Sequence, residues 1–357
     1  MSLMIKFILA NQNQLKKKPE KDQPLGFGKL FTDYLFVMEY DQDQGWHDAR
    51  IQPYQPLQLD PAALCFHYGQ ELFEGMKAYY HTHHIVLFRP KENFKRMQQG
   101  CHRLCMAPLD EALAFEGLTE LLKIEKDWIP KTKGSSLYIR PVLIATEPAL
   151  GVRASLTYLF FIILSPVGAY HPQGFNPLKI HVEDQFTRSA IGGTGYIKAS
   201  GNYAGSILAA HKAHAHHCSQ VLWLDAHDRK YAEEAGAMNI FFVMGDEIIT
   251  PPLTGTILPG ITRQSVIQLL KDWDQKIIER QISIDEIISG IESKKLTEIF
   301  GTGTAAIISP IGQLNYKEKI YTVNENKVGV ITQKLYDYLL ALQHDEIKDS
   351  HHWICRI

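Results

Sequence analysis

The segment from Gly168 to Pro177 divides this chain of 357 residues. It holds two glycines and two prolines in ten residues and has no apolar period, which is typical of a linker or loop. A chain of this length exceeds what one hydrophobic core usually supports, so we expect two domains. The sequence predicts an N-terminal domain over residues 1–168, an interdomain loop over 169–178 and a C-terminal domain over 179–357.

Both halves mix strands and helices. Runs rich in β-branched and aromatic residues predict strands, and apolar residues at helical spacing predict helices. The predicted strands cover residues 31–40, 85–88, 137–145, 158–164, 180–183, 221–224, 239–244, 247–249, 296–300 and 305–309. The predicted helices cover residues 91–105, 203–217, 261–270 and 328–342. Asn202 is expected to cap the second of these helices, and Ser283 with Glu286 fits a capping box before a further helix.

Charge and cysteine usage exclude several classes of protein. The 37 basic and 39 acidic residues give a net charge of −2, which argues against nucleic acid as a partner. The five cysteines include no C-x-x-C pair, as expected for reduced thiols in the cytoplasm. The apolar run Leu159–Leu164 is too short to cross a membrane, and the N-terminus has no signal-peptide pattern.

One lysine stands in a glycine-rich stretch. Lys198 lies within Gly192-Gly193-Thr194-Gly195-Tyr196-Ile197-Lys198-Ala199-Ser200-Gly201, immediately before a predicted helix. A desolvated lysine amine can form a Schiff base with a carbonyl. Taken alone, the stretch favours a solvated loop lysine beside a phosphate-binding turn.

Three further motifs are compatible with a phosphate-bearing ligand. Glu233-Glu234 precedes an apolar strand and offers either a solvated edge or a carboxylate aimed at a cationic ring nitrogen. Pro259-Gly260-Ile261-Thr262 opens a helix, and helix N-termini bind anions. Gly301-Thr302-Gly303-Thr304-Ala305 lets backbone amides approach an anion, but it matches neither the P-loop nor the Rossmann pattern.

Four histidines, His211, His214, His216 and His217, lie close together in the sequence. Residues three apart share a helix face, but no acid or cysteine nearby completes a ligand set. We therefore expect a polar helix face and no metal site.

The lysine stretch and the three motifs that suit a phosphate-bearing ligand together predict pyridoxal 5'-phosphate as cofactor. This molecule presents an aldehyde, a ring nitrogen and a phosphate. The alternative at this point is a non-enzymatic module that binds phosphorylated metabolites through its glycine-rich turns.

The ordered motifs resemble the branched-chain amino acid aminotransferases, which are fold type IV pyridoxal-phosphate enzymes. The motifs that carry the resemblance are Phe27-Gly28-Lys29, His67-Tyr68-Gly69, Phe73-Glu74-Gly75-Met76-Lys77-Ala78, Tyr138-Ile139-Arg140-Pro141, Lys198-Ala199-Ser200-Gly201-Asn202-Tyr203, Glu234-x-Gly236-x-Met238-Asn239 and Leu258-Pro259-Gly260-Ile261-Thr262-Arg263. They run in one order from about Leu25 to the last predicted helix.

The resemblance implies a mixed α/β (α+β) architecture with a smaller N-terminal α/β domain and a larger C-terminal mixed-sheet domain. It implies a transaminase that moves the amino group of leucine, isoleucine or valine to 2-oxoglutarate and serves the biosynthesis of these amino acids. Other fold type IV enzymes, such as D-amino acid aminotransferases and aminodeoxychorismate lyases, are the close alternatives, and the N-terminal match with Arg140 disfavours them.

The resemblance also implies roles for single residues. Lys198 would be the catalytic Schiff-base lysine, Glu234 the partner of the ring nitrogen and Tyr203 the partner of the ring oxygen. The remaining expected cofactor-binding residues are Arg96, Arg188, Ile261, Thr262 and Thr304. The expected substrate-binding residues are Phe27, Tyr68, Phe73, Tyr138, Arg140, Tyr170, Ala305 and Val152. Val152 matches a loop that reaches the neighbouring subunit's site in the family, which implies a homodimer.

Overall fold

The computed structural model describes residues 4–20, 23–132, 134–168 and 174–357, and it divides into two compact units. Unit 1 comprises Met1–Pro172, Lys198–Gly201 and Ala341–Ile357, and unit 2 comprises Gln173–Ile197 and Asn202–Leu340. Two short segments that the sequence places in the C-terminal domain, Lys198–Gly201 and the last seventeen residues, thus belong to unit 1 in this division. Unit 1 therefore holds more residues than unit 2, and the expectation of a smaller N-terminal domain is wrong.

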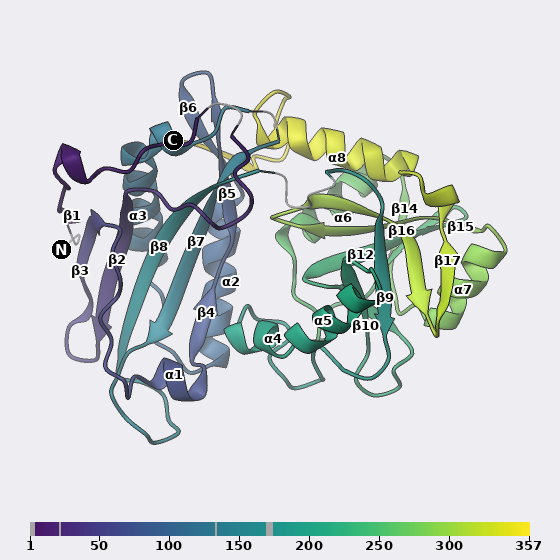
Figure 1. The fold of residues 1–357 in the computed structure, drawn as a ribbon, viewed down its shortest axis with the longest axis horizontal. Coiled ribbons are helices and arrows are strands. Elements are labelled where there is room, and N and C mark those ends of the chain that lie inside the picture. The colour runs from purple at the N-terminus through teal and green to yellow at the C-terminus, as the bar shows by residue number, and fades with distance from the viewer. Residues whose placement is uncertain (1–3, 21–22, 133, 169–173) are drawn as a thin grey trace. The chain divides into compact units, whose positions relative to one another are not determined.

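Unit 1 is built on one sheet with strand order β1-β3-β2-β8-β7-β5-β6-β18, and β4 pairs with β7 (Figure 1). Its strands are β1 (Lys6–Phe7), β2 (Tyr34–Asp41), β3 (Gly45–Pro53), β4 (Glu71–Phe73), β5 (Met76–His81), β6 (His84–Phe88), β7 (Ser136–Ala145), β8 (Thr157–Val167) and β18 (Ile354–Arg356). Only β1 and β3 pair in parallel among the described strands of this sheet.

The helices of unit 1 pack closely on this sheet. They are α1 (Leu64–Tyr68), α2 (Pro90–Arg103) and α3 (Glu111–Ile124), with the 3₁₀ turns η1 (Gln12–Gln14) and η2 (Lys126–Trp128). A Cβ at Gly117 of α3 would lie 2.4 Å from the Phe36 ring, and a Cβ at Gly100 of α2 would lie 2.7 Å from Leu72. These two glycines therefore let the helices approach the strands more closely than larger residues would allow.

Backbone pairing explains why the two outlying segments belong to unit 1. The Phe73 amide donates a hydrogen bond of 3.1 Å to the carbonyl oxygen of Lys198, and Ala199 forms a bridge with Leu72. The C-terminal strand β18 pairs antiparallel with β6, with Ile354 opposite Phe88. Main-chain hydrogen bonds to a buried sheet thus hold both segments.

Unit 2 contains a second sheet, which closes on itself. Its strand order is β11-β10-β9-β16-β15-β12-β13-β14, β17 pairs with β16, and β11 also pairs with β12. Its strands are β9 (Leu178–Glu183), β10 (Gln220–Leu224), β11 (Ala232–Ala235), β12 (Met238–Met244), β13 (Glu247–Thr250), β14 (Lys276–Glu279), β15 (Leu296–Gly303), β16 (Ile307–Tyr316) and β17 (Lys319–Thr322). Because β11 pairs antiparallel with β12, the turn that contains Gly236 joins two neighbouring strands of the sheet.

Apolar side chains of the second sheet form its core. Ile180, Leu222, Ile240, Phe242 and Leu314 belong to one buried cluster, and Trp223 joins a second cluster with two alanines of α5. The remaining helices are α4 (Ser200–Ala204), α5 (Ile207–Ala215), α6 (Ile261–Asp272), α7 (Ile284–Glu292) and α8 (Val330–Gln343), and η3 covers Asn324–Asn326. Among the residues that the structure describes, no helix combines the length and apolarity needed to cross a membrane.

The expected helix over residues 203–217 is wrong in one respect. It is two helices, because α4 ends at Ala204 and α5 begins at Ile207. Asn202 does not cap it, since its side-chain amide donates instead to the carbonyl oxygens of Thr194 (2.8 Å) and Ile197 (3.0 Å). Short polar side chains often bond to nearby backbone in this way, in competition with capping.

The other local predictions are confirmed only in part. Ser283 caps α7 by accepting a hydrogen bond from the Glu286 amide at 3.1 Å. The second half of the predicted capping box is wrong, because the Glu286 carboxylate pairs with Arg280 at 2.6 Å. The strand expected to begin at Ala305 begins at Ile307, and residues 304–306 form a turn.

Candidate active site

Lys198 lies beside the end of β4 in unit 1. Its amine nitrogen is 4.7 Å from the centroid of the Phe73 ring, and its carbonyl oxygen accepts the hydrogen bond from the Phe73 amide. The face of an aromatic ring attracts a nearby cation electrostatically. The backbone pairing and the ring together fix both ends of this lysine relative to Phe73.

A buried ion pair follows directly in the sequence. Glu74 is fully buried, and its two carboxylate oxygens accept hydrogen bonds from Nε (2.7 Å) and Nη2 (2.9 Å) of Arg96 on α2. Asn93, one turn earlier on α2, donates to the same carboxylate at 2.9 Å. The carboxylate therefore fixes the guanidinium of a residue that the sequence predicts to bind the cofactor phosphate.

The pKa of Glu74 reflects these partners. Burial opposes its charged form, but the charges of Arg96 and Lys198 and the bonds from Arg96 and Asn93 hold the pKa of Glu74 below its usual value. Glu74 thus stays ionised in the interior because its charge is matched on two sides.

Four of the predicted substrate-binding residues meet in unit 1. The Arg140 guanidinium carbon is 4.7 Å from the Phe73 ring centroid and 5.4 Å from that of Tyr138. Phe27 packs edge-on against Tyr138 at 4.9 Å. The predicted shared face of Tyr138 and Arg140 on one strand is confirmed, since Arg140 Nη2 donates to the Tyr138 hydroxyl at 3.3 Å.

Two features of this cluster suit an anionic ligand. The buried Nε of Arg140 has no hydrogen-bond partner among the described residues. A buried donor without a partner is costly, so such a group is typical of a site completed by a ligand. Gly75 makes room for the cluster, because a Cβ there would lie 2.2 Å from the Tyr138 hydroxyl oxygen.

Two other predicted substrate-binding residues of unit 1 are Tyr68, on α1, and Val152, on the exposed loop between β7 and β8. The Tyr68 hydroxyl on α1 donates to the carbonyl oxygen of Leu150, in the loop between β7 and β8. Leu150 and Val152 in that loop are 70% and 84% exposed. Tyr170 lies outside the described residues.

In unit 2, an ion pair and a hydrogen bond hold the Glu234 carboxylate on β11. Arg188 Nε lies 2.6 Å from Oε2, and the Asn239 amide donates to Oε1 at 3.1 Å. Arg188 also donates to the carbonyl oxygen of Thr256 at 2.7 Å and to that of Gly195. The structure thus brings Arg188 and Glu234, both predicted cofactor-binding residues, into one buried ion pair.

The neighbouring acid, Glu233, has a different environment. Successive strand residues point to opposite faces, so only one of this pair can face Arg188 closely. Glu233 accepts a hydrogen bond from the Thr256 hydroxyl at 2.5 Å, and burial raises its pKa. The two neighbouring acids therefore differ in their partners: Glu234 forms an ion pair with Arg188, whereas Glu233 accepts a hydrogen bond from a hydroxyl group.

A small cavity of about 90 Å³ lies beside Glu234. Arg188, Tyr203 and Gly236 are among its lining residues. The predicted residues Ile261 and Thr262 are the first two of α6, and Thr304 and Ala305 occupy the turn between β15 and β16. Helix starts and tight turns both present backbone amides to an anion.

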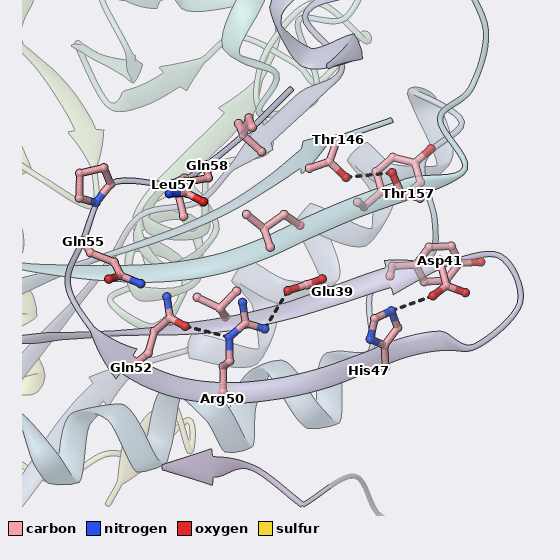
Figure 2. A pocket seen from close by; sticks show the side chains of 16 residues that line it. Glu39, Asp41, His47, Arg50, Gln52, Gln55, Leu57, Gln58, Thr146 and Thr157 are labelled. Carbon is pink, nitrogen blue, oxygen red and sulfur yellow. Dashed lines mark hydrogen bonds and ion pairs between the residues drawn. The ribbon is translucent and has the colours of Figure 1, made fainter. Parts of the chain in front are cut away.

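A larger cavity, of about 750 Å³, lies elsewhere on unit 1 (Figure 2). None of the predicted site residues that the structure describes lines it. Figure 2 shows polar groups of this cavity facing one another: Arg50 lies 2.9 Å from Glu39, and His47 lies 2.9 Å from Asp41. Because these groups pair with each other and no predicted site residue that the structure describes lines the cavity, we assign no chemistry to it.

Sequence reasoning missed three residues that organise the site. Glu74, Asn93 and Asn239 hold predicted residues in place, yet none was predicted to have a role. Glu74 and Asn239 lie inside the motifs that carry the family resemblance, and this position was the sequence feature that could have indicated a role for them. Within the described ranges, no group of three or more histidine, cysteine, aspartate or glutamate side chains is arranged to hold a metal ion.

The fold has close likenesses among solved structures of aminotransferases. A branched-chain amino acid aminotransferase from Escherichia coli superposes with a TM-score of 0.75 at 23% identity, over 90% of this chain and 98% of that one. The branched-chain aminotransferase from the thermophilic archaeon Thermoproteus uzoniensis, solved with norvaline, gives a TM-score of 0.74 at 23% identity, over 90% and 99%. These likenesses confirm the predicted mixed α/β, fold type IV architecture.

Sequence comparison then identifies the family. Residues 71–314 match the family model described as amino-transferase class IV, and the chain belongs to that family of enzymes. It is 51% identical to "Branched-chain-amino-acid aminotransferase 2" of Bacillus subtilis (strain 168), over 96% of this chain and 94% of that protein.

The Glu74–Arg96 pair gives a test of buried charge. We expect Glu74→Gln to lower the free energy of unfolding of the apoprotein by about 3 kcal/mol at neutral pH, because it leaves a buried arginine unpaired. Since the pKa of Glu74 is lowered in the folded state, its stabilisation is complete above the ordinary glutamate pKa and is lost as the pH falls through the folded value. The difference between wild type and variant should therefore shrink in acid.

Urea unfolding of both proteins at several pH values measures this difference. Glu92→Gln is the matched control, because Glu92 pairs with Lys95 on the surface of the same helix at 3.0 Å. An exposed pair contributes below about 1 kcal/mol, so this control should change little. Equal losses of unfolding free energy in the two variants would show that the buried Glu74–Arg96 pair does not stabilise the fold more than a surface pair.

Proposed function

We propose that this chain is a pyridoxal-phosphate-dependent branched-chain amino acid aminotransferase, which moves the amino group of leucine, isoleucine or valine to 2-oxoglutarate. The observation that carries the proposal is the 51% identity with a Bacillus subtilis relative of that name over 96% of the chain. The residue types that this chemistry needs occupy the motifs that resemble the family. The proposed reaction is reversible.

The side chains present fit the cofactor. Unit 1 offers an amine, Lys198, and a buried arginine, Arg96, which suit an aldehyde and a phosphate. Unit 2 offers the Glu234 carboxylate for a ring nitrogen, the phenol of Tyr203 for a ring oxygen, and Arg188 beside the carboxylate. The start of α6 at Ile261 and Thr262, and the turn at Thr304, suit the phosphate.

When bound, the cofactor supplies an aldehyde that condenses with amines and a ring that accepts electrons from the substrate Cα. Lys198 would hold the cofactor and, once its amine is displaced by that of the substrate, would carry a proton at its Nζ between donor and acceptor atoms. The Phe73 ring keeps one side of this amine apolar. Glu234 would keep a proton on the ring nitrogen.

The two substrates need one pocket that accepts both a methyl group and a carboxylate. The rings of Phe27, Phe73 and Tyr138 provide apolar surface, and Arg140 provides a cation between two of these rings. The unpartnered Nε of Arg140 supports its assignment to the side-chain carboxylate of glutamate or 2-oxoglutarate. Tyr68, Tyr170, Ala305 and Val152 complete the proposed substrate contacts.

We also propose that the protein is a cytoplasmic homodimer without membrane or nucleic-acid partners. Leu150 and Val152 expose large apolar side chains on one loop, and such patches mark contact surfaces. All five cysteines are free, which suits a reducing compartment.

The alternatives are separated by simple observations. A D-amino acid aminotransferase would use the D-enantiomer of its donor, whereas this proposal requires L-leucine, L-isoleucine or L-valine. A non-enzymatic module for phosphorylated metabolites would bind the phosphate but would form no covalent link with the cofactor.

The first prediction concerns Lys198. We expect the wild-type protein to take up pyridoxal phosphate with visible absorbance, and borohydride to fix the cofactor on the peptide that contains Lys198. Lys198→Ala should reduce turnover by about a thousandfold or more, because it removes both the attachment point and the proton carrier. Mass spectrometry locates the reduced adduct.

Lys212→Ala is the control for this experiment. Lys212 is an exposed lysine whose amine donates to Gln185, and its loss should leave turnover unchanged. A colourless protein that never takes up the cofactor, or full turnover by Lys198→Ala, would refute the proposed function.

The second prediction concerns Arg140. We expect Arg140→Ala to slow the half-reaction with glutamate about tenfold or more beyond its effect on the leucine half-reaction, because only glutamate carries a side-chain carboxylate. Single-turnover absorbance measures both half-reactions separately. Arg140→Lys keeps the charge and should show a smaller difference. Equal losses in the two half-reactions would show that Arg140 does not bind that carboxylate.

The third prediction concerns the dimer. Val152→Asp should weaken self-association, because it places a charge in an apolar contact. Sedimentation across a range of protein concentrations reports the mass. Val330→Asp is the matched control, since Val330 is 82% exposed in unit 2 and is assigned to no contact. A monomeric wild type, or an unaltered mass for Val152→Asp, would refute this assignment.

A further inference from the structure

One asparagine of unit 2 touches two elements that the proposed function assigns to the cofactor. Asn239 on β12 is 4% exposed. Its side-chain nitrogen donates to Glu234 Oε1 at 3.1 Å and to the carbonyl oxygen of Leu258 at 2.9 Å. Leu258 lies in the turn that leads into α6, so one amide group bridges the carboxylate and the helix start.

The sheet register explains why Asn239 reaches Glu234. The two residues stand directly opposite each other in the antiparallel pairing of β11 with β12. Cross-strand partners project from the same face, with their side chains in contact range. The turn at Gly236, with φ at +58°, sets this register, because only Gly236 and Ala237 lie between the paired residues Ala235 and Met238.

Packing fixes the orientation of the amide. A Cβ at Gly260 would lie only 2.0 Å from Asn239 Oδ1, so the amide oxygen rests on the backbone of that glycine. Gly260 is the N-cap residue of α6. The Asn239 amide therefore cannot turn away from Glu234 without also leaving the turn before α6.

The second oxygen of Glu234 has a different anchor. Arg188 approaches Oε2 at 2.6 Å and is itself bonded to the carbonyl oxygens of Thr256 and Gly195. Arg188 thus balances the charge of Glu234, whereas Asn239 connects the carboxylate to the helix start. A neutral NH₂ group suits this connection, because its two hydrogens can serve two acceptors without adding charge.

We propose that Asn239 is a positioning residue that fixes the Glu234 carboxylate and the first turn of α6 relative to each other. This inference rests on the proposed function, in which the carboxylate binds the cofactor ring and the helix start binds its phosphate. Ring and phosphate are joined covalently at a set separation. A protein that fixes its two contacts at the same separation avoids reorganisation on binding.

The experiment compares Asn239→Ala and Asn239→Ser with a matched control, Asn315→Ala. Asn315 is a buried asparagine on β16 of the same sheet, and its side chain bonds to Cys218 rather than to Glu234. The dissociation constant of pyridoxal phosphate is measured on each apoprotein. We expect it to rise about tenfold or more in both Asn239 variants, and to stay within about twofold of wild type in the control.

A spectroscopic measurement separates positioning from a general loss of stability. Weaker contact of Glu234 with the ring nitrogen removes positive charge from the ring, so the nitrogen that joins Lys198 to the cofactor should keep its proton to higher pH. The pH midpoint of the visible absorbance should therefore rise in the Asn239 variants and stay unchanged in Asn315→Ala. An unchanged midpoint in Asn239→Ala would overturn the proposal.

A third measurement needs no cofactor. Amide hydrogen exchange in the apoprotein should become about fivefold faster or more in the peptide over residues 257–264 of the Asn239 variants, because the Leu258 carbonyl loses its partner. Exchange of β16 should stay as in wild type, which also shows that the variants fold. Unchanged exchange at residues 257–264 would overturn the proposed link to α6.

The two proposals fail in different ways. A wild-type protein that takes up no pyridoxal phosphate would refute the proposed function. A wild type that binds it, with Asn239 variants that match its dissociation constant, absorbance midpoint and hydrogen exchange, would refute only the role of Asn239.

Discussion

A charge inside a protein must be matched, and this constraint organises both units. Unit 1 buries Glu74 against Arg96, and unit 2 buries Glu234 against Arg188. Taking an ion from water costs several kcal/mol, which is recovered only when hydrogen bonds satisfy the remaining atoms. Asn93 and Asn239 provide such bonds. Arg96 and Arg188, which the sequence assigns to the cofactor, thus each form an ion pair with a buried carboxylate of the protein itself.

The backbone builds these networks by bringing distant segments into register. The segment Lys198–Gly201 joins unit 1 through its pairing with β4, next to Phe73 and Glu74. In unit 2, the strands close through the β11–β12 pairing, which places Asn239 opposite Glu234. A shift of one residue in either pairing would turn these side chains to the other face, so main-chain hydrogen bonds decide which groups can act together.

Several residues of the candidate site could be named from the sequence because their residue types are distinctive. A lysine among glycines, a carboxylate before a buried strand and a Pro-Gly helix start each have a chemical reason, and their order along the chain is that of the family. Glu74 and Asn239 lie in the same motifs but were not predicted to have roles. The role of Glu74 cannot be predicted from its sequence neighbours, because it depends on α2 placing Arg96 against the carboxylate. The break between α4 and α5 lies at Gly205 and Ser206, where the Ser206 hydroxyl donates to the carbonyl oxygen of Tyr203 at 2.7 Å, and no apolar periodicity indicates it.

The sequence by itself indicated the mixed α/β class, the more apolar strands of both sheets and a set of candidate reactive groups, because apolar periodicity and residue chemistry are local properties. It did not predict strands with a weaker apolar pattern, such as β3, β5 and β14. The tertiary structure alone decided which charges are paired. It placed Arg140 over Phe73, separated Glu233 from Glu234 and joined Asn239 to the start of α6. Pairing depends on distances of a few ångströms between residues far apart in the chain, and only strand register and helix packing set those distances.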